Sequence, residues 1–183
     1  MNGLMSLTVE DLEKIQATHP DYRMELVDGN VVVMSPSGYE SEEVGTEFAR
    51  LLGNWVRPRQ LGRVAGSSAG FRLPNQDLRA PDVSFIRADR LKRSTEDYAE
   101  LLPDLVVEVK SKTDSLDKLR EKIQEFISLG TQIGILIDLR TKTMEVYRSN
   151  EKIVLQNNDV LTLPDLLPGW EVNIAEIWSP VFE

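Results

Sequence analysis

The sequence predicts an α/β domain built on a mixed central β-sheet that is flanked by helices. First, residues 105–109 form an apolar run interrupted by one acid, which is typical of a strand buried on both faces. Second, a helical pattern at 114–129 and another apolar run at 133–139 follow, so residues 104–139 form a predicted strand–helix–strand unit with parallel strands. Third, turn signals between shorter apolar runs predict antiparallel hairpins, which make the sheet mixed.

Composition limits the class of protein and of site. The chain has 183 residues, 41% of them hydrophobic, which suits one domain with its own core, and we assign residues 1–183 to that domain. The absence of cysteine and the single histidine, His19, argue against thiolate catalysis, a histidine triad and Cys or His metal sites. Any metal must then bind to oxygen ligands. Because no membrane-length apolar stretch or signal peptide is evident, we expect a cytoplasmic protein without a membrane partner.

The N-terminal third predicts two helices and a hairpin. Thr8 and Asp11 form a capping box for a helix that ends near Thr18. The strands 23–27 and 31–34 flank a turn at 28–30 that contains glycine and asparagine, which favour a hairpin. Apolar residues at helical spacing then predict one long amphipathic helix over 41–57.

The rest of the chain predicts mainly strands. Short strands are expected at 63–65, 70–73 and 80–86, and the polar loop 88–103 is long enough that we expect it near a functional site. After the strand–helix–strand unit, residues 144–147 and 153–155 predict a hairpin. The tail to residue 178 should end in a short apolar helix that closes the core.

Three charged residues in apolar strands form the predicted site. Period-2 geometry places Glu108 and Lys110 on the same face of the 105–110 strand, and Asp82 begins the 80–86 strand. A buried unpaired charge costs several kcal/mol, so these groups need each other, a metal or a substrate. The simpler alternatives are a structural Glu108–Lys110 ion pair and a strand-end role for Asp82.

Charge is distributed unevenly along the chain. The net charge of −9 argues against general affinity for nucleic acid. However, residues 57–93 hold nine basic residues, including Arg72 and Arg79, and only three acids. This segment is a candidate surface for a polyanionic substrate, or else a solvated rim.

These residue types predict metal-assisted hydrolysis of a phosphodiester. Two carboxylates about 4 Å apart repel by roughly 4 kcal/mol at an effective dielectric near 20, so a cation is needed between them. Mg²⁺ binds one or two protein carboxylates together with phosphate oxygens. Lys110 could then orient or deprotonate the attacking water, or stabilise the transition state.

The site residues also resemble a known family. Pro81-Asp82, followed 26 positions later by Glu108-Val109-Lys110, resembles the PD-(D/E)xK nuclease superfamily with its restriction endonuclease-like core. The framework is similar to the Uma family of restriction endonuclease-like proteins over almost the whole chain. The matching segments are 22–29, 34–36, 79–83, 103–109, 122–130, 137–138, 146–148 and 167–169.

The resemblance implies a DNA endonuclease that requires Mg²⁺ or Mn²⁺. Asp82 and Glu108 would be metal ligands, joined by Glu25, and Lys110 would be the catalytic lysine. Many relatives lack a lysine at this motif position and are suspected of using one from the next helix, where this chain has Lys122 and Gln124. Together with Arg72 and Arg79, these two helix residues are candidates for substrate binding.

A departure from the family pattern leaves other functions open. The relatives' early helix histidine is absent here, and Glu42 stands nearby. One alternative is a catalytically silent module that binds nucleic acid or protein, and another is a phosphodiesterase acting on RNA or small nucleotides. Because cutting both strands of a duplex is easiest with two related active sites, we also expect a homodimer.

Overall fold

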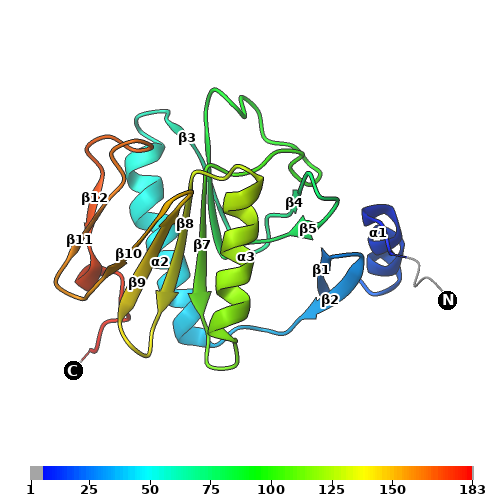
Figure 1. Ribbon diagram of the computed structural model, residues 1–183, viewed down its shortest axis with the longest axis horizontal. Coiled ribbons are helices and arrows are strands. Elements are labelled where there is room, and N and C mark those ends of the chain that lie inside the picture. The colour runs from blue at the N-terminus through cyan, green and yellow to red at the C-terminus, as the bar shows by residue number, and fades with distance from the viewer. Residues whose placement is uncertain (1–5, 183) are drawn as a thin grey trace.

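The computed structural model describes residues 6–182 and has a six-stranded mixed sheet with a helix on each face (Figure 1). Residues 1–5 and 183, which belong to the predicted 1–183 domain, lie outside the described residues. The elements in chain order are α1 (Val9–Thr18), β1 (Arg23–Val27), β2 (Asn30–Met34), α2 (Tyr39–Val56), β3 (Gly62–Gly66), β4 (Phe71–Arg72), β5 (Leu78–Arg79), β6 (Val83–Arg87), β7 (Leu105–Lys110), α3 (Leu116–Leu129), β8 (Ile133–Asp138), β9 (Thr143–Arg148), β10 (Glu151–Leu155), β11 (Val160–Thr162), β12 (Glu171–Asn173) and the 3₁₀-helix η1 (Ile174–Glu176).

The predicted strand–helix–strand unit is confirmed. β7 and β8 are parallel, in a register that runs from Leu105 opposite Ile133 to Lys110 opposite Asp138. Ser115 caps the connecting helix α3 by accepting a hydrogen bond from Lys118 N, and Gly130 ends it at a φ of +123° that other residues rarely adopt. The remaining pairs of this sheet, in the order β10-β9-β8-β7-β6-β3, are antiparallel.

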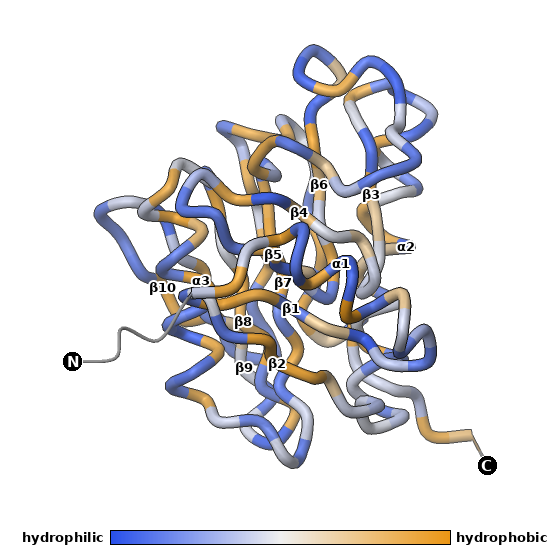
Figure 2. Tube along the Cα trace, turned by 90° about the vertical axis from the view of Figure 1, so that its right-hand side faces the viewer, coloured by the Kyte–Doolittle hydropathy of each residue, from blue (hydrophilic) through white to orange (hydrophobic). Residues whose placement is uncertain are grey.

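The alternation of side chains along β7 determines which helix covers which face. Val107 and Val109 pack with Val44 and Phe48 of α2 in the main core. Val106, on the opposite face, packs with Phe126 of α3. Figure 2 shows the central strands as mostly hydrophobic and the outer loops as mostly hydrophilic. Because α3 covers the face that includes residues 106, 108 and 110, polar groups on that face meet the side chains of this helix.

The first hairpin forms as predicted but belongs to a second sheet. β1 and β2 pair in register from Arg23–Met34 to Val27–Asn30, and this sheet has the order β2-β1-β5-β4. α1 packs onto it through Leu12, beside Leu26 and Leu78. These elements form an N-terminal lobe to one side of the central sheet (Figure 1). No sequence pattern predicts β5, which is only two residues long and is stabilised by strands on both sides.

The C-terminal segment closes the core, and its predicted short helix is present as a 3₁₀-helix. That helix, η1, is a single turn, and it follows a small sheet formed by β11 and β12. Trp170, Ile174 and Ile177 are nevertheless buried in the main core, as expected for a closing segment. Among the described residues, none of the helices combines the length and apolar character needed to cross a membrane.

Candidate active site

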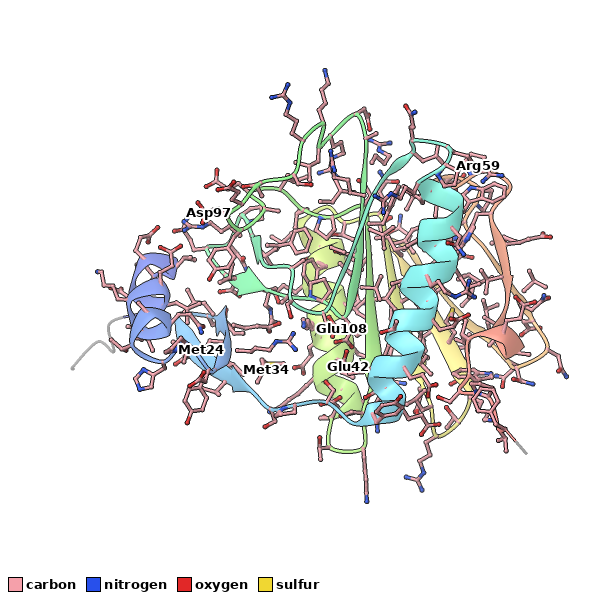
Figure 3. The ribbon with its side chains drawn as sticks, turned by 180° about the vertical axis from the view of Figure 1, so that it is seen from behind. Met24, Met34, Glu42, Arg59, Asp97 and Glu108 are labelled. Atoms are coloured by element: carbon pink, nitrogen blue, oxygen red, sulfur yellow. The ribbon has the colours of Figure 1, made fainter. Side chains whose placement is uncertain are left out.

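A cleft of about 740 Å³ lies between the N-terminal lobe and the central sheet. The residues that line it include members of β1, β2, β5, β7 and α3 and of the segment that leads into β6. Five of the candidate residues are in this lining: Glu25, Arg79, Asp82, Glu108 and Lys122. Figure 3 shows Glu108 near the middle of the molecule, between α2 and the N-terminal lobe.

Strand register brings Asp82 and Glu108 together. β6 and β7 are antiparallel with Val83 opposite Val107, so Asp82 comes beside Glu108 although they are 26 residues apart. The backbone N–H of Val109 donates a 2.7 Å hydrogen bond to Asp82 Oδ2, which fixes the orientation of that carboxylate. Glu108 is 2% exposed.

Lys122 of α3 is the cation nearest to these acids. Its ammonium lies 2.9 Å from Glu25 Oε1, 3.0 Å from Glu108 Oε1 and 2.9 Å from the carbonyl oxygen of Ala80. Burial alone would lower the pKa of Lys122, but Glu108 and Glu25 raise it well above the usual value. The three donors of this ammonium therefore face three protein oxygens, and the group stays charged.

Glu25 and Arg79 extend this cluster toward the N-terminal lobe. Glu25 Oε1 also accepts a 2.9 Å hydrogen bond from Ala80 N, and its Oε2 lies 3.1 Å from Arg79 Nη1. Burial would raise the pKa of Glu25, but Lys122, the Ala80 N–H and Arg79 together lower it. The backbone that leads into Asp82 is therefore fixed by an ionised glutamate.

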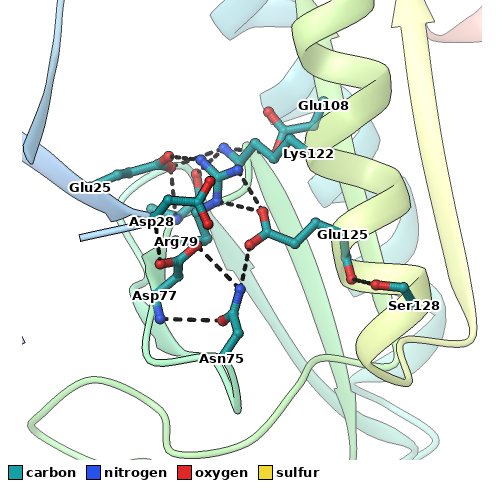
Figure 4. Close-up of polar contacts among 10 residues, drawn as sticks. Glu25, Asp28, Asn75, Asp77, Arg79, Glu108, Lys122, Glu125 and Ser128 are labelled. Carbon is teal, nitrogen blue, oxygen red and sulfur yellow. Dashed lines mark hydrogen bonds and ion pairs between the residues drawn. The ribbon is translucent and has the colours of Figure 1, made fainter. Parts of the chain in front are cut away.

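A further layer of polar residues holds Arg79 in place (Figure 4). Glu125 of α3 accepts hydrogen bonds of 2.9 and 2.6 Å from Arg79 Nε and Nη2. Asn75 donates to Glu125 at 2.8 Å and to Asp77 at 3.3 Å. Burial, followed by the neighbouring Glu125, raises the pKa of Asp77 to about 6. Sequence reasoning did not select Asn75, Asp77 or Glu125.

Burial makes the two central carboxyls weak acids. Desolvation, with Asp82 and Glu25 nearby, raises the pKa of Glu108 to about 8 despite the opposing effect of Lys122. Burial also raises the pKa of Asp82, assisted by Glu42 and Asp114 and opposed by the Val109 N–H and Lys122. Two adjacent carboxyls with raised pKa values at one cleft are typical of a functional site.

Three other predicted residues lie elsewhere. Lys110 shares a strand face with Glu108, but it is absent from the cleft lining, and its ammonium donates to the carbonyl oxygen of Ser111 at 3.3 Å. Arg72 is paired with Glu10 and Glu13 of α1. Gln124 is exposed on α3 and does not line the cleft.

The site fits a divalent cation that takes few protein ligands. Within residues 6–182, no three acidic or histidine side chains gather in an arrangement that would hold a metal ion. Asp82 and Glu108 provide two adjacent carboxylates, and only one oxygen of each has a partner described above. This donor set matches Mg²⁺, which binds one or two carboxylates and completes its shell with water and phosphate oxygens.

Comparisons with known proteins show the family and the fold. The model of the Uma2 family, described as "Putative restriction endonuclease", matches residues 9–175. A crystal structure of a putative nuclease from Anabaena variabilis is similar with a TM-score of 0.80 and 22% identity, covering 93% of this chain and 97% of that one. A DrdV–DNA complex aligns with a TM-score of 0.41 and 15% identity over 79% of this chain and 11% of that chain. Among curated proteins, none matches.

Proposed function

Because this chain belongs to the Uma2 family of restriction endonuclease-like proteins, we propose that it is a divalent-metal-dependent DNA endonuclease. The observation that carries the proposal is the adjacent pair of carboxyls, half-buried Asp82 and buried Glu108, at the wall of an open cleft. The pKa of each is raised by burial, and Lys122 lies against one of them. Such a pair is costly for a scaffold alone and is suited to holding Mg²⁺ or Mn²⁺.

The residues of the cleft have separate roles in this mechanism. Asp82 and Glu108 would hold the cation, which when bound lowers the pKa of water and neutralises charge on a phosphate. Glu25 supports the site indirectly, because its carboxylate fixes both the Ala80 N–H and the Lys122 ammonium. Arg79 in turn fixes Glu25, and Glu125 fixes Arg79.

Two lysines could supply the positive charge near the reacting phosphate. The motif assigns this role to Lys110, but the cleft geometry favours Lys122, whose ammonium lies 3.0 Å from Glu108. All three donors of Lys122 face protein oxygens, so a phosphate oxygen would have to replace one of them as acceptor. The acceptor easiest to replace is Glu108 Oε1, which is close to the ammonium but has no well-aligned hydrogen bond.

A homodimer is part of the proposal. Cutting both strands of a duplex is simplest with two related sites. β2 is the outer strand of its sheet, and it exposes Val32, Val33 and Met34, an apolar edge of the kind that pairs with another chain. Light scattering after size-exclusion chromatography should give a dimeric mass, and Val33→Lys should lower it. A monomeric mass at all concentrations would remove the dimer from the proposal.

The test of the activity uses purified protein with plasmid DNA, RNA and cyclic nucleotides in Mg²⁺, Mn²⁺ or EDTA. We expect cleavage of DNA that requires the metal and that is lost in Asp82→Asn and Glu108→Gln. The matched control is Asp165→Asn, because Asp165 is an exposed acid outside the cleft. Cleavage of RNA or cyclic nucleotides instead would support the phosphodiesterase alternative. DNA binding without any cleavage would support the silent module, and equal activity in the site variants would remove the assignment of the site.

A further inference from the structure

A second groove continues the cleft along the face of β6. This β6 groove, of about 580 Å³, is lined by residues of β3 and β6 and by the loop 91–99. It shares Ser68, Gly70 and Tyr98 with the lining of the cleft, so the two hollows meet there. Gly70 is required at this junction, because a Cβ at residue 70 would lie 2.6 Å from the Tyr98 ring.

The floor of the β6 groove leads directly away from the carboxylates. Asp82, which lines the cleft, precedes β6, and Ser84 and Ile86 line the groove. Residues at this period-2 spacing share one face of a strand. At about 3.3 Å per residue, the five steps from Asp82 to Arg87 span about 17 Å. A nucleic acid strand with about 3.4 Å per nucleotide covers this distance in about five nucleotides.

Basic side chains gather at the far end of the β6 groove. Arg63 fixes the loop there, because its guanidinium donates to the carbonyl oxygens of Leu91 at 3.0 Å and Lys92 at 2.7 Å and to Ser94 Oγ at 3.0 Å. The side chains of Lys92 and Arg93 are exposed, and neither forms an ion pair among the described residues. In Figure 3, Arg59 also lies toward this end of the molecule, well away from Glu108.

The charges on and beside the groove differ along its length. Arg87 and Arg90 are held by buried Asp104, at 3.5 and 2.8 Å respectively. Glu96 and Asp97 are acidic members of the wall, so the groove is not uniformly positive. Unpaired positive charge is therefore concentrated beyond residue 91, at the end furthest from the carboxylates.

We propose that the β6 groove and the exposed Lys92 and Arg93 bind the phosphodiester backbone that flanks the scissile phosphate, about five nucleotides from it. The inference rests on the proposed nuclease function for the position of the scissile phosphate. A protein with a net charge of −9 gains little from nonspecific attraction to nucleic acid. The affinity must therefore come from basic side chains that lie close to the groove.

The test is binding of fluorescein-labelled nucleic acid, followed by anisotropy with Ca²⁺ or EDTA so that no hydrolysis is needed. Duplexes of about 8 and about 24 base pairs are compared, because the contacts lie about five nucleotides from the centre. In Lys92→Gln/Arg93→Gln, affinity for the longer duplex should fall about tenfold at about 100 mM salt, and the salt slope should become shallower by about 1.8. Affinity for the shorter duplex should change less than about twofold.

The matched control is Lys14→Gln/Arg50→Gln, which removes the same charge from side chains that are 77% and 53% exposed on α1 and α2. The control should bind both lengths as the parent does. Equal losses in control and test variants, or no loss on the longer duplex, would overturn the groove assignment. Single-stranded DNA and RNA of matching length determine whether the bound backbone must be duplex DNA.

The outcomes separate this inference from the proposed function. A protein that binds through Lys92 and Arg93 but never cuts supports the groove and contradicts only the nuclease. A protein that cuts, and whose Lys92→Gln/Arg93→Gln variant binds both lengths as the parent does, keeps the nuclease and contradicts only the groove.

Discussion

Replacing Lys122 with methionine should damage both the stability and the activity of the protein. The substitution keeps the length of the side chain but removes the ammonium that lies within 3.0 Å of Glu25 and Glu108. Glu25 retains Arg79 and the Ala80 N–H, whereas Glu108 loses the cation nearest to it. Removing one partner of a buried pair costs about 3–5 kcal/mol, and we expect about 3 because Glu108 can take up a proton instead.

The assay for stability is urea unfolding at neutral pH, and the assay for activity is single-turnover cleavage of DNA in Mn²⁺. With Lys122→Met, the cleavage rate should fall by about 10²- to 10³-fold, as is common when one electrostatic donor is lost from an active site. Lys110→Met is the matched control, since Lys110 has one 3.3 Å contact to a backbone carbonyl oxygen and should change stability by less than about 0.5 kcal/mol.

A double substitution tests the physical reason directly. Lys122→Met/Glu108→Gln removes both charges, so it should be more stable than Lys122→Met alone, because no uncompensated carboxylate is left in the core. The reasoning fails if the double variant loses the summed free energy of the two single variants. It also fails if Lys110→Met abolishes cleavage while Lys122→Met does not.

Three further predictions concern stability. Hydrogen bonds, the largest of them from Arg120, lower the pKa of Glu145 to about 2. Glu145 therefore stabilises the folded state above pH ~4.5 by about 3 kcal/mol, and this stabilisation is lost as the pH falls toward 2. Glu145→Gln should remove that acid dependence from urea melts, and an unchanged profile would contradict the assignment. Gly134→Ala should cost about 1–3 kcal/mol, because its Cβ would lie 2.4 Å from Ile123 Cγ2. Gly134→Ala/Ile123→Ala lacks that Cγ2 and should therefore lose less free energy of unfolding than the two single variants summed, whereas additive losses would contradict this cause. Thr8→Ala should cost about 1 kcal/mol by removing the cap of α1, whereas a variant with parental stability would show that α1 does not need it.

The elements that could be predicted from sequence are those with a clear pattern of apolar residues or with a turn that requires glycine or asparagine. The apolar run at 105–109 and the helix with Gly130 after it are examples, and both are observed. β5 and the β11–β12 pair could not be predicted, because strands of two or three residues have no detectable period and form only where a partner strand is already present. Likewise, no local signal assigns the first hairpin to a separate sheet.

The loop 88–103 shows that a length argument can predict proximity to a site without predicting which residue reaches it. It joins the end of β6 at Arg87 to the start of β7 at Leu105, which is the opposite end of both strands from Asp82 and Glu108. Only Tyr98 of this loop reaches the cleft lining. Whether a loop is near a site depends on strand direction, and the antiparallel pairing of β6 and β7 could not be derived from the loop itself.

In the same way, some residues of the site could be selected from the sequence and others are recognisable only in the fold. Asp82 and Glu108 could be selected because acids are conspicuous in apolar strands. Asp77 and Glu125 could not, since a polar residue in a loop or on a helix is ordinary until the fold brings a partner to it. Their connection to the site passes through Arg79, which contacts residues that are 54 and 46 positions away in the chain.

Strand geometry explains only in part why Lys122 lines the cleft and Lys110 does not. Period 2 correctly puts Glu108 and Lys110 on one face, but Lys110 is the last residue of β7, where its side chain can turn toward Ser111 and solvent. Lys122 carries a different signal, because it follows Leu119 by three residues and precedes Phe126 by four, which places it on the buried stripe of α3. A lysine on such a stripe must find buried acids, and the only face that α3 covers is the one to which Glu108 belongs. A buried ammonium is tolerable only beside carboxylates. The packing of α3 on β7 therefore accounts for both the buried position of Lys122 and the presence of Glu108 in an apolar strand.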